Sequence, residues 1–209
     1  MCQFIETIRI ENGVIHNLEY HNQRFNSTRR QFFPHAIDLD LGTSIKVPSE
    51  GGRIKCRILY NEEIREITYT PYTLRPIHSL QMIHCNSLNY RYKSSSRDEL
   101  NALFAQRNSC DDVLIVKNGM LTDTSIANIA VGNGSQWFTP AKPLLEGTQR
   151  AFLINKGIVI PKDIIVEDIF CYKKIALFNA LIPFGELIIP ITPQTIVIVR
   201  RAENNKLSE

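Results

Sequence analysis

The 209-residue sequence has few of the features that mark specialised protein classes. It contains one tryptophan and five scattered cysteines, and no two cysteines form a CxxC pair. This pattern is typical of free thiols in a reducing compartment and does not predict a metal site, so we expect a cytoplasmic protein without a metal. No apolar run approaches the roughly 18–20 residues that span a bilayer, and the N-terminus does not resemble a secretory signal. We therefore expect neither a membrane segment nor secretion.

Charge and nucleotide motifs exclude further classes. The 24 basic and 21 acidic residues leave a net charge of +3, and the positive residues are spread along the chain. The doublets Arg29-Arg30 and Arg200-Arg201 are too short to form a patch that follows a phosphate backbone, so we expect no nucleic-acid partner. The sequence also lacks a GxGxxG turn after a strand, a Walker loop and a GxSxG motif.

The first third of the chain predicts two β-hairpins and a helix. Alternating apolar residues indicate strands, and Asn12-Gly13 and Asn61-Glu62 favour the two turns. Asn17 is a candidate N-cap for a helix that Pro34 stops. The predicted strands are 4–10 paired with 14–15, and 53–60 paired with 63–70.

The remainder mixes strands and helices. The apolar segment 113–116 predicts a strand buried on both faces. Ser96 has capping-box spacing before a helix, and 147–155 and most of 164–181 have helical patterns. Segments 188–189 and 195–199 resemble closing strands. This mixture predicts an α+β (mixed α/β) fold rather than a Rossmann sheet. We place a domain boundary near residues 72–85, which gives domains 1–75 and 76–209.

Four short motifs contain the candidate functional residues. Each motif alone has an ordinary explanation, such as an exposed arginine or lysine, an Asx turn or a helix start. In chain order the motifs are His21-Asn-Gln-Arg24, Tyr92-Lys93-Ser94, Thr122 to Asn128, and Pro143 to Arg150.

In this order the motifs resemble the class IV pyridoxal-phosphate enzymes, a family that includes branched-chain and D-amino acid aminotransferases and 4-amino-4-deoxychorismate lyase. Phe4 to Gly13 is similar to the family's FETIR strand, 21–25 to its HxxRL helix, 122–128 to its TExSxxN block and 144–150 to its LLxGxxR helix start. The resemblance implies a two-domain D-amino acid aminotransferase-like fold (fold type IV), pyridoxal 5'-phosphate as cofactor, a small-molecule substrate and a homodimer.

The resemblance also implies a role for each candidate residue. Lys93 forms the Schiff base and moves the substrate proton, and Asp123 keeps the pyridine nitrogen protonated. A lysine needs burial or a nearby cation, such as Arg91, to be nucleophilic at pH 7. The implied contacts to the phosphate come from the Arg24 guanidinium, from the backbone N–H groups of Gly147, Thr148 and Gln149, and from the pocket wall at Ser125, Ala127 and Asn128.

Two departures keep alternatives open. Asp123 replaces the family's usual glutamate, and Gln149 replaces its usual threonine. The compact length and the first strand favour aminodeoxychorismate lyase, which releases pyruvate to form 4-aminobenzoate on the folate route. The alternatives are a class IV aminotransferase and a non-catalytic member used for binding or assembly. A basic strand face at Arg53, Lys55 and Arg57 could contact a dianionic substrate, or could simply be solvated.

Overall fold

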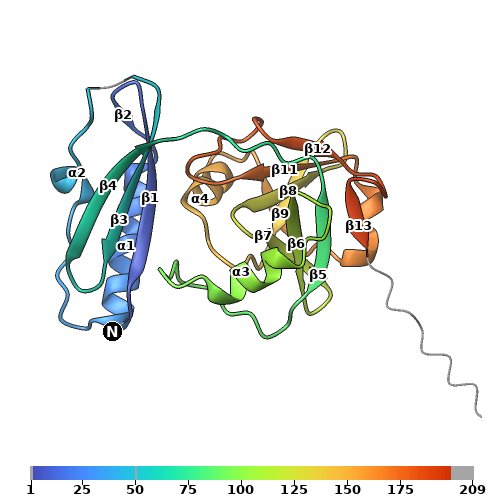
Figure 1. The fold of residues 1–209 in the computed structure, drawn as a ribbon, viewed down its shortest axis with the longest axis horizontal. Helices are drawn as coiled ribbons and strands as arrows, with labels where there is room; N and C mark the ends of the chain where they lie inside the picture. Colours follow the sequence, from blue (N-terminus) through green and yellow to red (C-terminus); the bar gives the residue numbers. More distant parts are fainter. Residues whose placement is uncertain (1, 50, 199–209) are drawn as a thin grey trace, which may run out of the picture.

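The computed structural model describes residues 2–49 and 51–198, and its strands form two separate sheets (Figure 1). The first sheet has four strands and the second has nine. The doublet Arg200-Arg201 and the end of the strand predicted at 195–199 lie outside the described residues. The predicted mixture of strands and helices is confirmed.

The N-terminal sheet is antiparallel, in the order β2-β1-β3-β4. Its strands are β1 (Phe4–Glu11), β2 (Val14–Ile15), β3 (Arg53–Tyr60) and β4 (Ile64–Pro71). β1 pairs with β3 along its whole length, from Phe4 opposite Tyr60 to Glu11 opposite Arg53. Both predicted hairpins are confirmed. The first turns at Asn12 and Gly13, whose φ angles of 50° and 80° fit a tight turn with left-handed residues.

Helix α1 (Leu18–Phe32) packs on one face of this sheet, and the short helix α2 (Leu41–Ser44) follows it. Phe25 is fully buried in a cluster with Ile8, Ile58 and Tyr60. The predicted helix is confirmed, but Asn17 does not cap it with its side chain. The Asn17 amide instead donates a hydrogen bond to Gln149 Oε1 at 2.7 Å and so ties α1 to a distant segment.

The second sheet has the order β10-β9-β8-β7-β6-β5-β13, and β11 pairs with both β8 and β12. Strand β6, between β7 and β5, contains 113–116, which is buried as the apolar run predicts. The strands are β5 (Leu80–His84), β6 (Asp112–Lys117), β7 (Met120–Thr124), β8 (Asn128–Gly132), β9 (Trp137–Pro140), β10 (Ile160–Lys162), β11 (Lys174–Phe178), β12 (Ile188–Pro190) and β13 (Ile196–Ile198).

Three shorter helical segments belong to this part of the chain. They are α3 (Asp98–Ala105), α4 (Thr148–Asn155) and a 3-10 helix at Val166–Cys171. α4 begins after Gly147, as predicted. The capping box at Ser96 is wrong, because α3 begins after Arg97 and the Ser96 hydroxyl donates to the Asp98 carboxylate.

The helix predicted over 164–181 is also wrong. The second half of this segment is strand β11, which pairs antiparallel with β8 on one side and with β12 on the other. Its residues 175–178 are completely buried. A fully apolar run fits a buried helix or a buried strand equally well. Here the segment is a strand because it pairs with the free edge of β8.

Residues 72–79 connect the two sheets across the top of Figure 1. Backbone hydrogen bonds also join the two parts: Ile5 N donates to Lys93 O, and Ser95 N donates to Gln3 O, both at 2.9 Å. Arg53 reaches from β3 to Glu186 in a two-bonded ion pair. The division into domains 1–75 and 76–209 stays a prediction.

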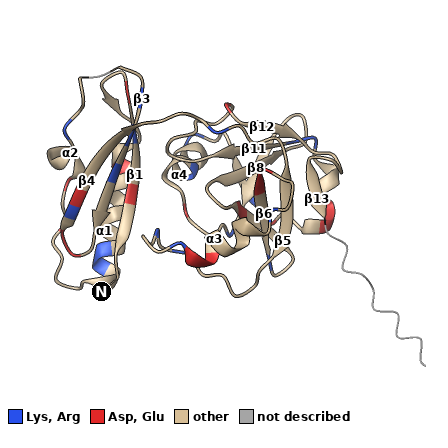
Figure 2. Ribbon diagram, in the orientation of Figure 1, with Lys and Arg blue, Asp and Glu red and all other residues tan. Residues whose placement is uncertain are grey.

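Basic and acidic residues are interspersed over both parts of the molecule (Figure 2). No helix within 2–49 or 51–198 has both the length and the apolarity to cross a membrane.

We predict that Phe25→Ala lowers the free energy of unfolding by about 3–5 kcal/mol, because it removes a fully buried ring and leaves a cavity. Urea denaturation followed by circular dichroism measures the change. Ile37→Ala is the matched control, since the Ile37 side chain is 76% exposed and should change stability by less than about 0.5 kcal/mol. Equal effects of the two substitutions would contradict the assigned core.

Candidate active site

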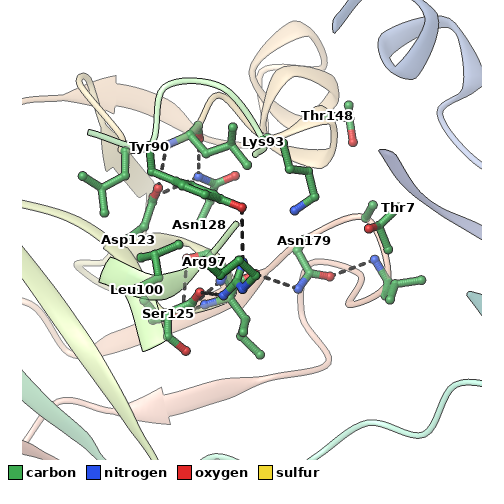
Figure 3. A pocket seen from close by; sticks show the side chains of 18 of the residues that line it. Thr7, Tyr90, Lys93, Arg97, Leu100, Asp123, Ser125, Asn128, Thr148 and Asn179 are labelled. Carbon is green, nitrogen blue, oxygen red and sulfur yellow. Dashed lines mark hydrogen bonds between the residues drawn. The ribbon is translucent and has the colours of Figure 1, made fainter. Parts of the chain in front are cut away.

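A pocket lies where the N-terminal sheet, α1 and the second sheet meet, and it contains most of the predicted site residues (Figure 3). Thr7 contributes from β1, and Tyr90 and Arg97 contribute from the segment between β5 and α3. Eight of the nine predicted residues line it, namely Arg24, Lys93, Asp123, Ser125, Ala127, Asn128, Gly147 and Thr148. Gln149 does not.

The position of Lys93 depends on contacts between distant segments. Its carbonyl accepts a hydrogen bond from Ile5 N at 2.9 Å, and Ser94 forms an isolated bridge with Phe4. The neighbouring Tyr90 hydroxyl donates to Ser94 O at 3.1 Å. The Lys93 side chain extends into the pocket, and the described residues offer its amine no hydrogen-bond partner (Figure 3). The loop is therefore fixed while the amine is free to react.

The surroundings of Lys93 favour the neutral amine. Burial is the main cause that lowers its pKa to about 7, and the positive charges of Arg24 and Arg97 act in the same direction. Glu6 and Asp123 oppose the shift. Of the two causes that the sequence offered, burial is the larger, and the cations are Arg24 and Arg97 rather than the candidate Arg91, which is exposed and stacks on Tyr92. Near neutral pH a substantial fraction of Lys93 can thus act as a nucleophile or base.

Asp123, at the end of β7, is held by residues that are close only in the fold. Asn128 Nδ2 donates to its Oδ1 and Leu145 N donates to its Oδ2, both at 2.9 Å. Burial raises the pKa of Asp123 to about 6, although these two hydrogen bonds oppose the shift. The pocket therefore contains a carboxyl group that can share a proton with a basic nitrogen.

Arg24 is engaged by a buried carboxylate that the sequence analysis missed. Arg24 Nε donates to Glu6 Oε1 at 2.9 Å, and Nη2 donates to Oε2 at 2.6 Å. The third nitrogen, Nη1, lies 3.4 Å from the Glu146 carbonyl beside α4. Burial opposes ionisation of Glu6, but Arg24 and His21 outweigh it and lower the pKa of Glu6 to about 2. These bonds use three of the five guanidinium N–H groups, so one N–H on Nη1 and one on Nη2 remain for another anion.

The N-terminal end of α4, which lies near Arg24 Nη1, offers backbone N–H donors. Gly147 comes so close to Asn128 that an added Cβ would lie 2.0 Å from Asn128 Oδ1, and only glycine fits there. The Thr148 hydroxyl lines the pocket, and unsatisfied N–H groups at a helix N-terminus bind anions. Gln149 directs its side chain to Asn17 instead.

The pocket adjoins a larger cleft of about 980 Å³, and five residues line both cavities. They are Arg24, Tyr90, Leu144, Gly147 and Thr148. None of Arg53, Lys55 and Arg57 lines either cavity, and Arg53 is paired with Glu11 and Glu186. No group of three His, Cys, Asp or Glu residues in the described part of the chain could hold a metal ion.

Comparisons with known proteins identify the family of this chain. The model of the family described as amino-transferase class IV matches residues 58–191. The chain belongs to the class IV aminotransferase family. An uncharacterized protein of Haemophilus influenzae is 37% identical over 185 residues, which cover 87% of this chain and 98% of that protein.

Solved structures share the fold of this class IV family member. A protein of Haemophilus somnus 129PT, provisionally named 4-amino-4-deoxychorismate lyase, is 35% identical with a TM-score of 0.83 and covers 88% of this chain and 98% of its own. The pyridoxal-phosphate-bound form of a hypothetical aminotransferase from Mycobacterium tuberculosis is 18% identical with a TM-score of 0.71, over 88% and 80% of the two chains. The predicted fold type IV is confirmed.

Two residues that shape the pocket of this class IV aminotransferase family member were missed at the sequence level: Glu6, which is buried behind Arg24, and Arg97, which lines the pocket. Glu6 carries a detectable signal, because alternation places it on the apolar face of β1 with Phe4 and Ile8. A carboxylate on a buried face must find a cationic partner, and α1 offers Arg24. Arg97 has no comparable signal, since its hydrogen bond to Ser125 O joins segments 28 residues apart.

We predict that one lysine of the cofactor-free protein reacts with trinitrobenzenesulfonate with a midpoint near pH 7. The amine reacts only when neutral, so the rate should rise between about pH 6 and 8 and then level off, whereas ordinary lysines react freely only near their pKa of about 10.4. In Lys93→Met this component should disappear. A wild-type profile without any component below about pH 9 would contradict the neutral amine.

Proposed function

We propose that the protein is a 4-amino-4-deoxychorismate lyase, which eliminates pyruvate from its substrate and leaves 4-aminobenzoate. The observation that carries the proposal is the convergence of Lys93, Asp123, Arg24 and the N-terminal end of α4 on one pocket. The pocket holds a neutral lysine, a carboxyl group and an anion-binding end at separate positions, which are the three groups that pyridoxal phosphate requires.

As a class IV aminotransferase family member, the protein is an enzyme that uses pyridoxal phosphate. The pocket fits this cofactor: Lys93 would attach it, Asp123 would face its pyridine nitrogen, and Gly147, Thr148 and Arg24 would hold its phosphate. The close approach of Gly147 to Asn128 leaves the backbone at this end open to a ligand. The alternative of a non-catalytic binding protein is not supported.

Lys93 does the proton chemistry in this proposal. When bound, pyridoxal phosphate provides an electron sink for the carbon that bears the substrate's amino group. The Lys93 amine removes the proton from that carbon, the bond between the neighbouring ring carbon and the enolpyruvyl oxygen breaks, and the released enolate takes up one proton at carbon to become pyruvate. Burial of Lys93 keeps the amine neutral for this step and limits competition from water.

Two features of the chain favour the lyase over an aminotransferase. The Haemophilus somnus relative that shares 35% of its residues carries the lyase name. The strand Phe4–Glu11 also resembles that subgroup. An aminotransferase that acts on an amino acid and a 2-oxo acid is the second candidate, because the same Lys93 and Asp123 would serve it.

The proposal includes the folate route, the cytoplasm and a homodimer. Free thiols suit a reducing compartment, and all five cysteines are free in the structure. Sedimentation of the active protein tests the dimer, and a stable active monomer would contradict it.

We predict that cofactor-loaded protein releases pyruvate and 4-aminobenzoate from 4-amino-4-deoxychorismate without any 2-oxo acid. Lactate dehydrogenase coupling measures the pyruvate. Lys93→Ala should lose both this activity and the lysine adduct that borohydride traps, with the fold checked by circular dichroism. Activity that requires a 2-oxo acid and shows ping-pong kinetics would favour the aminotransferase instead. A chain that cannot be loaded with the cofactor would overturn both.

We predict that Asp123→Asn slows substrate proton abstraction by about 10²–10³-fold, because it removes the charge that stabilises a protonated pyridine nitrogen. Cofactor affinity should fall much less, since the phosphate contacts remain. Single-turnover absorbance measures the first and equilibrium titration the second. Asp123→Glu is the matched control and should retain proton abstraction. Equal rates for wild type and Asp123→Asn would refute the assigned role.

A further inference from the structure

A buried chain of hydrogen bonds links β1, α1 and α4 behind the pocket wall. His21 Nδ1 lies 2.6 Å from Glu6 Oε2, and His21 Nε2 lies 3.2 Å from the Thr148 hydroxyl oxygen. Glu6 and His21 are completely buried and Thr148 is 3% exposed. His21 therefore joins a fixed negative charge to a hydroxyl group that lines the pocket.

The ionised Glu6 determines which ring nitrogen of His21 carries a proton. Because the pKa of Glu6 is about 2, its carboxylate only accepts hydrogen bonds at neutral pH. Nδ1 must therefore donate its proton to Glu6. The remaining question is whether Nε2, which faces Thr148, is bare or protonated.

The state of Nε2 controls the direction of the Thr148 hydroxyl. In the neutral ring Nε2 is an acceptor, so the Thr148 hydroxyl donates its only hydrogen to His21 and presents lone pairs to the pocket. In the protonated ring Nε2 donates to Thr148, and the hydroxyl hydrogen is free to point into the pocket. Only the second arrangement lets Thr148 donate to an anion.

The charges around His21 favour the neutral ring when no anion is bound. Burial is the main cause that lowers the pKa of His21, and Arg24 on the same helix and Lys93 on the loop before α3 lower it further. Glu6 on β1 opposes the shift. Thr148 is the first residue of α4 and contacts Nε2, so the positive end of the α4 helix dipole also faces His21.

We propose that binding of a phosphate group at the N-terminal end of α4 is coupled to the uptake of one proton by His21. The proton passes from solvent to His21 Nε2, which then donates to Thr148, and the Thr148 hydroxyl turns to donate to a phosphate oxygen. No covalent bond other than N–H changes. His21 is a positioning residue here, and the inference rests on the proposed function only in that the phosphate belongs to the cofactor.

Proton linkage gives the direction in which pH changes the affinity for phosphate. A phosphate dianion near His21 stabilises the imidazolium, so the complex binds more protons than the free protein. The association constant should therefore rise as the pH falls, by up to about tenfold per pH unit where one full proton is taken up. The dependence should flatten below the pKa of the free protein, which lies below the usual 6.5.

The test is calorimetry with pyridoxamine 5'-phosphate, which has no aldehyde to react with Lys93. Titrations at pH 7 in two buffers of different ionisation enthalpy give the number of protons taken up. Wild type should take up more protons than His21→Gln, with a difference approaching one, and its affinity should fall more steeply between pH 6 and 8. Ionisation of the ligand is common to both proteins and cancels in the comparison.

Thr148 provides the matched pair of variants. Thr148→Ser should retain the extra proton uptake, and Thr148→Val should lose most of it together with affinity. Nitrogen NMR of the His21 ring in wild type gives an independent measurement: inorganic phosphate or pyridoxamine 5'-phosphate should convert Nε2 from bare to protonated. Because this measurement uses only the wild-type protein, it does not depend on whether a variant folds.

Equal proton uptake and equal pH slopes in wild type and His21→Gln would overturn the inference. A ring already doubly protonated at pH 7 without any ligand would do the same. These outcomes leave the proposed lyase intact, because pyruvate release is measured separately. Failure to bind pyridoxamine 5'-phosphate at all would overturn the cofactor site and the inference together, whereas binding without pyruvate release would reject only the lyase.

Discussion

The rest of the site depends on one buried carboxylate. Glu6 is completely inaccessible to solvent and accepts hydrogen bonds from Arg24 and His21 on the facing helix. Removing one partner from a buried ion pair costs about 3–5 kcal/mol, so β1 and α1 are held in one relative position. That position brings the Arg24 guanidinium to the pocket and places His21 against Thr148.

The pocket combines the N-terminal sheet and helix with the part of the chain that follows them. The first strand supplies the N–H of Ile5 to the carbonyl of Lys93, and α1 supplies the cation that helps to keep the Lys93 amine neutral. The pKa of Asp123 shifts in the other direction, because burial raises it and the more distant charge of Arg150 opposes burial only in part; within residues 2–49 and 51–198 no arginine forms an ion pair with Asp123. One site therefore contains a base and an acid whose pKa values are shifted toward neutrality, an arrangement typical of proton-transfer enzymes.

Much of the local structure was predictable because the physics is local. Alternation and the turns at Asn12-Gly13 and Asn61-Glu62 placed the first two hairpins, and the helix start at Gly147 follows from the neighbouring residues. The segment 164–181 was not predictable, since an apolar run does not reveal which sheet edge awaits it. The choice of Arg91 as the cation near Lys93 failed for a related reason: separation along the chain is a poor measure of distance in the fold.

By itself the sequence determined the family, the residue types of the site and their order, because the four motifs retain the chemical groups that the cofactor needs. Only the tertiary structure decided how those groups are charged and aimed. Burial and the charges of Arg24, Arg97 and Glu6 set the state of Lys93, and the Asn17 contact turns Gln149 away from the pocket. Hydrogen bonds and electrostatic shifts depend on distances in space, and folding alone brings Glu6, Lys93 and Thr148 together.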